Sequence, residues 1–222
     1  MQLEKRGYKI SLMVNKLNQD LISSLIANNS KVLDIGCGNG DLLLHLEKTK
    51  NINGQGIEIS PKGVQESVSK GLSVIQGDAD IDLINFPDNA FDIVILSHTL
   101  QATHKPKEVL TEMLRIGKKG IISIPNFGYW KYRLQMLFLG IMPITKTLSA
   151  PWYSTPNIHL CTIKDFINLC EILNISINGT FRNTTYGIKK INKPNRYINN
   201  LLSIEGIFVL SNLTLCLFNK LS

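Results

Sequence analysis

One unit of this sequence limits the fold more than any other: an apolar run that stops at a cluster of glycines and is followed by a helical segment. The run is Lys31 to Ile35 (KVLDI), the cluster is Gly36 to Gly40 (GCGNG), and residues of helical composition follow from Asp41 to Lys48. Glycine tolerates backbone conformations that other residues avoid, so it allows a sharp change of direction. The pattern predicts a buried strand, a tight turn and a helix.

The same alternation continues as far as residue 125. Buried parallel strands are continuous apolar runs, and the crossovers that join them are helical. The alternation therefore predicts an α/β fold, a doubly wound and mostly parallel sheet with helices on both faces. The further strands expected are Gly56 to Ile59, Leu72 to Gln76, Phe91 to Ser97 and Gly120 to Pro125, and the further helices are Pro61 to Lys70 and Pro106 to Ile116.

The segments before and after this unit complete the expected architecture. An amphipathic helix is expected at about residues 14–27, and an irregular insertion rich in proline and aromatic residues at about 126–160. No repeat or Gly/Ser linker interrupts residues 1–222, so we expect a single domain. A helix over Thr162 to Leu173 and strands over Ile175 to Arg182 and Gly206 to Phe218 would close a sheet of seven strands with a hairpin.

The charge is unevenly distributed along the chain. The net charge is +7, and from Met113 onward 13 Lys and Arg face 3 Asp and Glu. Such asymmetry fits a basic surface toward an acidic partner, a nucleic acid or a membrane, and equally a solvated basic face. Within this half, Arg182 to Arg196 contains five basic residues, Tyr186 and no acid, which fits RNA binding. A solvated loop is favoured there, because Asn, Gly and Pro make up much of the rest.

Cysteine usage and hydropathy predict a cytoplasmic protein without a membrane segment. The four cysteines show no C-x-x-C spacing, so we interpret them as reduced thiols. The stretch from Leu134 to Ile144 is far shorter than the ~20 apolar residues that cross a bilayer, and the first residues lack the apolar run of a signal peptide. His159, Cys161 and Cys170 lack a fourth ligand at a recognisable spacing, so no metal site is expected.

Polar residues and glycines follow four of the expected strands. In a doubly wound sheet, ligands bind beyond the carboxyl ends of the strands. Glu58 follows Gly36 by 22 positions, close to the ~20-residue offset at which an acid meets a ribose diol. A nucleoside ligand is therefore expected. The candidate cofactor-binding residues are Asp34, Gly36, Cys37 and Gly38 after the first strand, Glu58 and Ile59 after the second, Asp78 and Ala79 after the third, and Ser97 after the fourth.

Each of these features also has a purely structural interpretation. A strand-to-helix junction needs glycine for its geometry alone, Glu58 fits a solvated loop, and Asp78 fits the cap of a turn. Their joint occurrence at successive strand ends favours adenosine binding.

Charge indicates which adenosine compound is bound. The dinucleotide fingerprint G-x-G-x-x-G has a third glycine where this chain has Asp41, and Asp34 lies just upstream. Two carboxylates would repel a pyrophosphate, but they suit the ammonium and sulfonium of S-adenosylmethionine. The expected cofactor is S-adenosylmethionine or S-adenosylhomocysteine. The motif G-x-x-x-x-G-K-[ST] of phosphate-binding loops is absent.

Several strings of this chain resemble the MetW family of bacterial methionine biosynthesis proteins. They are VLDIGCGNGDLLLHL, GIEIS, VIQGDAD, FPDNAFDIVILSHTLQ, EMLRIGKKGIISIPNFGYW and PWYSTPNIHLCTIKDF. The resemblance covers roughly Asn18 to Ile177 and implies the class I S-adenosylmethionine-dependent methyltransferase fold. It also implies association with a homoserine O-acyltransferase, as partner or activator.

The same resemblance implies roles for individual residues. Asp34 would help hold the methionine ammonium, while Gly36 and Gly38 give backbone access; Glu58 would take the ribose hydroxyls. Asp78 would take the adenine amino group, with a backbone contact from Ala79. The chain departs from the family pattern at Asn39, where Asp is frequent, and at His98, where Gln is expected.

The alternative function is methyl transfer to a small molecule or an RNA. Displacement at a sulfonium is accelerated largely by alignment and exclusion of water, so no single residue certifies it. His98 and His104 fit general bases, and equally structural hydrogen-bonding residues. The fourth strand ends in SHTLQ and lacks the [DN]-P-P-[YF] loop of amino methyltransferases that act on bases.

Overall fold

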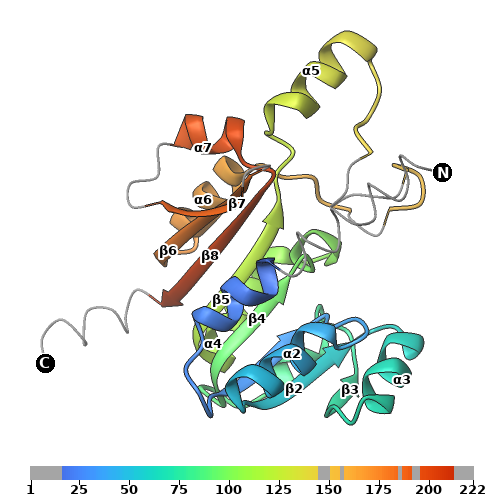
Figure 1. Cartoon of the computed structure of the whole chain (residues 1–222), viewed down its shortest axis with the longest axis vertical. Coiled ribbons are helices and arrows are strands. Elements are labelled where there is room, and N and C mark those ends of the chain that lie inside the picture. The colour runs from blue at the N-terminus through green and yellow to red at the C-terminus, as the bar shows by residue number, and fades with distance from the viewer. Residues whose placement is uncertain (1–16, 145–150, 156–157, 185–186, 192–195, 213–222) are drawn as a thin grey trace, which may run out of the picture.

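The fold is built on one mixed sheet of eight strands (Figure 1). The computed structural model describes residues 17–144, 151–155, 158–184, 187–191 and 196–212. The strands lie in the order β3-β2-β1-β4-β5-β8-β6-β7. Their bounds are β1 Lys31–Ile35, β2 Asn53–Glu58, β3 Val74–Gln76, β4 Phe91–Ser97, β5 Gly117–Pro125, β6 Ile175–Thr184, β7 Gly187–Ile191 and β8 Glu205–Asn212.

The first five strands are parallel, and the chain reverses its winding between β1 and β4. Strand β1 pairs with β2 on one side and with β4 on the other. Strand β8 is antiparallel to both β5 and β6, and β7 is antiparallel to β6. The point where the winding reverses is where doubly wound sheets bind their ligands, beyond the carboxyl ends of the strands.

Helices cover both faces of the sheet, as the alternation of apolar runs predicts. On one face, buried residues of α4 (Pro106–Ile116) and α6 (Ile163–Ile172) belong to the same core cluster as Leu33 and Val94. On the other face, α2 (Asp41–Lys50) and the helical residues 17–24 pack on Val32 and Ile95. The remaining helices are α3 Pro61–Ser69, α5 Trp130–Leu139 and α7 Arg196–Leu202, with short 3-10 turns η1 Asp82–Asn85 and η2 Leu100–Ala102.

Local chemistry explains why several predicted bounds agree with the structure. Strand β4 and helix α4 have the predicted ends, and Pro106 occupies the first turn of α4, where its missing N–H costs nothing. Helix α6 begins after Thr162, which forms a capping box with Asp165. The N-terminal helix is described only from residue 17, so its predicted start lies outside the described residues.

The predicted number of seven strands was wrong, because the basic segment adds an eighth. Residues 183–184 extend β6 beyond its predicted end, and β7 returns beside it from Gly187, where the favoured prediction was a solvated loop. The pairing is possible because Ile188 packs against the core while Lys189 and Lys190 remain exposed. Exposed lysines on an edge strand discourage further pairing. Residues 185–186 and 192–195, and the part of the predicted last strand beyond 212, lie outside the description.

The predicted insertion contains an exposed apolar helix. Helix α5 buries none of its residues and stands away from the sheet in Figure 1. Its large apolar side chains that face solvent include Leu134, Leu137, Phe138 and Leu139. Among the described residues, no helix is both long enough and apolar enough to cross a bilayer.

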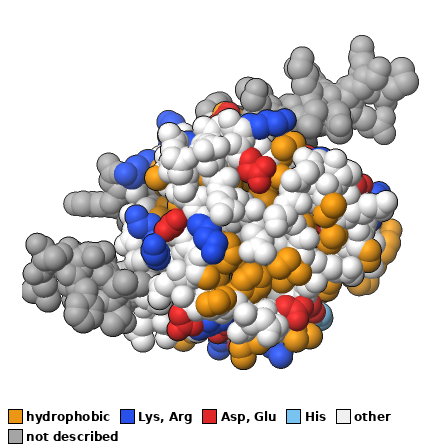
Figure 2. Space-filling view, turned by 90° about the horizontal axis from the view of Figure 1, so that it is seen from below, with side chains coloured by type: hydrophobic (Ala, Val, Ile, Leu, Met, Phe, Trp, Pro, Cys, Tyr) orange, Lys and Arg blue, Asp and Glu red, His pale blue; other side chains and the backbone are white. Residues whose placement is uncertain are grey.

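Positive and negative side chains are mixed on the face of the molecule that lies at the bottom of Figure 1. Figure 2, seen from below Figure 1, has Lys and Arg side chains interspersed with Asp, Glu and apolar side chains on that face. Two of the ion pairs in the described part of the chain join Arg115 to Glu112 and Lys118 to Asp92. Part of the positive charge after Met113 is therefore compensated by acids from the earlier half.

Truncating the centre of β1 tests the packing of this sheet. Leu33 has no exposed surface, so Leu33→Ala removes buried methyl groups and leaves a cavity. We expect the free energy of unfolding to fall by about 2–5 kcal/mol in urea titrations. Ile84→Ala, on a side chain that is 74% exposed, should change it by less than about 0.5 kcal/mol. Equal losses in the two variants would contradict the assigned burial.

Candidate functional site

The glycine turn after β1 has the left-handed backbone that its sequence predicts. Gly36, Gly38 and Gly40 have φ values of 71°, 57° and 75°. A Cβ on Gly36 would lie 2.5 Å from side-chain atoms of Thr99, whereas one on Gly38 would meet nothing within 4 Å. Gly36 is thus needed for close packing, and Gly38 for its conformation and for an open approach to the backbone.

Glu58 connects this turn to the end of β2. Its side chain accepts hydrogen bonds from the backbone N–H of Gly38 and of Ser60, both at 2.8 Å. The residue is buried, at 9% exposure. The carboxylate is therefore fixed at the carboxyl edge of the sheet, and each oxygen keeps acceptor capacity for a further donor.

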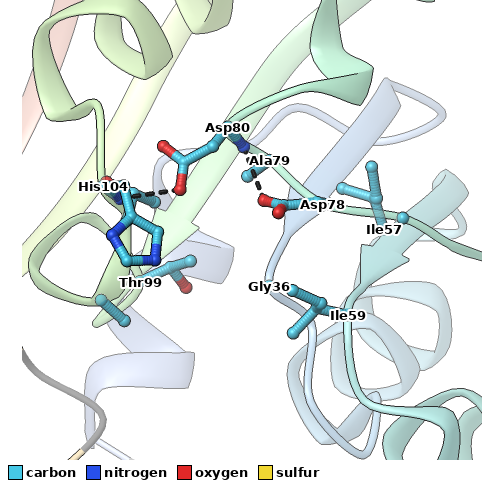
Figure 3. A pocket seen from close by; sticks show the side chains of 11 residues that line it. Gly36, Ile57, Ile59, Asp78, Ala79, Asp80, Thr99 and His104 are labelled. Atoms are coloured by element: carbon cyan, nitrogen blue, oxygen red, sulfur yellow. Dashed lines mark hydrogen bonds between the residues drawn. The ribbon is translucent and has the colours of Figure 1, made fainter.

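A first cavity of about 140 Å³ lies beside the glycine turn (Figure 3). Asp80 shapes one side of it by accepting hydrogen bonds from the backbone N–H of His104 and of Lys105, both at 2.7 Å. Asp78 accepts a bond from the Asp80 backbone N–H at 2.9 Å. The cavity is lined by the apolar side chains Ile57, Ile59, Ala79 and Ala102, together with Gly36, Gly77, Asp78, Asp80, Thr99, Thr103 and His104.

A second cavity of about 230 Å³ lies on the other side of the turn and is more polar. Gly36 lines both cavities. Ser97 reaches the second one from the end of β4, where its hydroxyl is 3.2 Å from that of Ser123. The helical residues 17–24 contribute Asn18, Gln19 and Ile22, and the other lining residues are Asp34, Cys37, Gly38, Asn39, Asp41, Leu42 and His98.

Asp34 is the most perturbed carboxylate of the second cavity. It is 2% exposed, and its Oδ1 has no hydrogen-bond partner among the residues that the structure describes. Burial and, second, the charge of Glu58 raise the pKa of Asp34 from 3.8 to about 7. A cationic group placed beside this oxygen would offset the cost of its burial.

Cys37 has a packing role in the turn. A Cβ added to Gly56 would lie only 2.6 Å from the Cys37 sulfur. The thiol therefore fills the space beside Gly56 on β2. Burial, with smaller contributions from Asp34 and Glu58, raises the pKa of Cys37 to about 12. The thiol therefore stays protonated and is a poor nucleophile.

The structure brings the nine predicted residues to one edge of the sheet. Ile59, Asp78 and Ala79 line the first cavity. Asp34, Cys37, Gly38 and Ser97 line the second, with Gly36 in both and Glu58 bonded to the turn between them.

Several residues of the site were missed by sequence reasoning. Asn18 and Gln19 belong to a helix predicted only as amphipathic, and Thr99 and Asp80 lie in strings that resemble the family but were given no role. His98 bonds through Nε2 to Glu205 at the start of β8, 107 positions later. No local pattern in the sequence predicts a pair so far apart in the chain.

Comparison with known proteins places these observations in a family. The family described as "Methionine biosynthesis protein MetW" matches residues 16–210. The "Bifunctional methionine biosynthesis protein MetXA/MetW" of Rhodopirellula baltica is 35% identical over 171 residues, which are 73% of this chain. The chain spans only 27% of that relative's length. A demethylmenaquinone methyltransferase of Staphylococcus carnosus is 32% identical over 141 residues, 58% of either chain.

Solved structures share the fold. An S-adenosylmethionine-dependent methyltransferase from Thermotoga maritima superposes with a TM-score of 0.64 over 93% of this chain and 94% of its own, at 14% identity. This likeness establishes the methyltransferase fold, as the sequence predicts.

The burial of Asp34 predicts a pH-dependent stability. The unfolded chain loses this proton near pH 3.8 and the folded chain only near 7. The contribution of Asp34 to the free energy of unfolding therefore falls as the pH rises from about 4 to 7, and is constant above. In urea titrations, the free energy of unfolding of Asp34→Asn relative to that of the unsubstituted chain should rise by about 3 kcal/mol from pH 4.5 to pH 8, since one pKa unit is about 1.4 kcal/mol. A difference that does not vary with pH would contradict the assignment.

Proposed function

This chain belongs to the MetW family of methionine biosynthesis proteins, and we propose on that premise that it binds S-adenosylmethionine or S-adenosylhomocysteine at the carboxyl edge of β1 to β4. One observation carries the proposal. An apolar cavity and a polar cavity meet at Gly36, with the fixed Glu58 carboxylate at the same turn. This division matches a ligand with an aromatic base at one end and a charged amino acid at the other.

The first cavity suits the adenosine part. Glu58 would accept hydrogen bonds from the ribose hydroxyls with the acceptor capacity that Gly38 and Ser60 leave free. Asp78 would accept from the adenine amino group. Ile59, which is 62% exposed at the cavity, would cover one face of the base.

The second cavity suits the methionine part. The unpartnered Oδ1 of Asp34 would receive the α-ammonium, and Cys37, Gly38 and Ser97 would line the path of the chain. When bound, the sulfonium form supplies an activated methyl group. The protein's own residues orient the ligand and exclude water around it.

We further propose that the protein acts with a homoserine O-acyltransferase. The relative in Rhodopirellula baltica joins a MetXA part and a MetW part in one chain. A fused relative supports association between the separate proteins. If ligand binding favours one conformation of this chain, it changes the partner's affinity reciprocally, typically by ~1–3 kcal/mol.

Helix α5 supplies a surface suited to such a partner. Leu137, Phe138 and Leu139 are 73%, 75% and 65% exposed, and Trp152 and Tyr153 nearby in the chain are 73% and 75% exposed. Large apolar side chains that gather on a surface usually mark an interaction site.

Methyl transfer is the second candidate function, as the sequence also indicated. It is favoured by the likeness to the Staphylococcus carnosus enzyme named as a demethylmenaquinone methyltransferase. Incubation of a cell extract with S-adenosylmethionine labelled in its methyl group distinguishes the two. Label that moves to a small molecule or an RNA only when the protein is added supports this candidate.

Substitution of Glu58 tests the ligand. Glu58→Gln keeps the shape but loses the charge that strengthens two ribose hydrogen bonds. We expect the Kd for S-adenosylhomocysteine in calorimetry to rise by roughly 10–100-fold, since a hydrogen bond to a charged group contributes about 1.5–3 kcal/mol. Glu66→Gln, on an exposed turn of α3, should leave the Kd unchanged. An unaltered Kd in the Glu58 variant would remove its role at the ribose.

Substitution of α5 tests the partner. The protein with Leu137→Glu and Phe138→Glu should lose at least about tenfold in affinity for the homoserine O-acyltransferase of the same organism, because charges would be desolvated in the contact. Ile84→Glu, at an equally exposed apolar position, is the matched control. The readouts are co-purification and the acyltransferase rate with and without the added protein. If the unsubstituted protein neither co-purifies with the acyltransferase nor changes its rate, the proposed association is refuted.

A further inference from the structure

The second cavity contains an ionisable group that the binding scheme above does not use. Among its lining residues, the ionisable side chains besides the Cys37 thiol are Asp34, Asp41 and His98. Asp34 and Asp41 are acids, and Oδ1 of Asp41 already lies 2.7 Å from Lys70 Nζ. His98 is therefore the lining residue that can carry a positive charge.

A buried carboxylate holds His98 in place. Nε2 of the imidazole is hydrogen-bonded to Oε1 of Glu205, which has no exposed surface, while the His98 side chain is 32% exposed. Glu205 Oε2 accepts further bonds from Asn18 at 2.7 Å and Asn183 at 3.3 Å. Four separate elements thus meet at this point: the helical residues 17–24, the end of β4, β6 and β8.

This arrangement favours the charged form of both partners. Burial opposes ionisation of Glu205, but the pairing with His98 and the two amide donors outweigh it and lower its pKa. Burial likewise acts against the charge of His98, but Glu205 outweighs it and raises the pKa of the imidazole. In an imidazolium both nitrogens are donors, and since Glu205 takes one of them, Nδ1–H is left for another acceptor.

The register of the sheet places His98 near the unpartnered acid. Asp34 on β1 pairs with Ile95 on β4, three residues before His98. His98 itself has a φ of 59° and a backbone N–H bonded to the carbonyl of Ser123 on β5, so the residue turns sharply just past the strand. The Asp34 carboxyl and the His98 imidazole therefore lie at neighbouring strand ends and line one cavity.

We propose that His98, held by Glu205, receives the α-carboxylate of the ligand's amino-acid part, while Asp34 receives its α-ammonium. The inference rests on the proposed binding of S-adenosylmethionine or S-adenosylhomocysteine and adds the residue that recognises the acid group. An α-amino acid is a zwitterion, and the unpartnered Asp34 oxygen and the Nδ1–H of His98, at adjacent strand ends, match its two charged groups.

Two ligands separate this role from a general effect on the pocket. S-adenosylhomocysteine carries the amino-acid part, and 5′-methylthioadenosine lacks it. We expect His98→Gln to raise the Kd for S-adenosylhomocysteine in calorimetry by roughly tenfold, because a charge-assisted hydrogen bond becomes a neutral one. The Kd for 5′-methylthioadenosine should stay within about twofold. His104→Gln, on the first cavity, is the control and should leave the ratio of the two Kd values unchanged.

The outcomes are distinct. An unchanged Kd for S-adenosylhomocysteine in His98→Gln, or equal weakening of both ligands, overturns the role of His98. If the unsubstituted protein binds neither compound, the proposed function fails instead. Glu205→Gln should give the same selective loss of S-adenosylhomocysteine as long as circular dichroism shows an intact fold. If it unfolds, His98→Gln decides alone.

Discussion

The burial of the Asp34 carboxylate without a hydrogen-bond partner is the constraint on which the rest of this structure depends. A carboxylate 2% exposed in the middle of a parallel sheet destabilises the folded chain once it ionises, and the raised pKa of Asp34 expresses that cost. The residue lies at the end of β1, next to the point where the winding reverses. A position that is unfavourable for stability and favourable for a cation is what a binding site requires, since function often retains strain that packing alone would remove.

The glycine turn and Glu58 convert this position into a shaped site. Left-handed backbone at Gly36 and Gly38 brings the chain close to Thr99 and leaves open space beside the turn. Glu58 then fixes the turn through the backbone of Gly38, so the acid proposed for the ribose also holds the loop that the ligand would approach. In the proposed scheme, one carboxylate thus serves both ligand binding and the local fold of the turn.

The sequence predicts the local parts of this molecule better than the distant ones. The bounds of β4 and α4 and the candidate residues at the strand ends follow from apolar runs, Pro106 and the glycine cluster, all signals within a few positions. The strand count fails at β7, because Ile188 and Ile191 are separated by two consecutive lysines inside a segment whose Asn, Gly and Pro content indicates a loop. The His98–Glu205 pair was out of reach, because its partners are separated by 107 positions and are joined only by the antiparallel closure through β8.

The connection between the ligand edge and the insertion runs through one buried side chain. Gln101 belongs to η2. Close to it in the chain, Thr99, Ala102 and Thr103 line the first cavity. Its Nε2 donates to the carbonyl of Pro125 at the end of β5 and to the sulfur of Cys161, and its backbone carbonyl accepts from the N–H of Ile158 and of His159. The insertion that contains α5 is therefore fastened to the wall of the cavity by hydrogen bonds at both of its ends. Under the proposed function, a ligand that shifts η2 would act on the insertion through these bonds, which offers a route from the site to a partner that needs no methyl transfer.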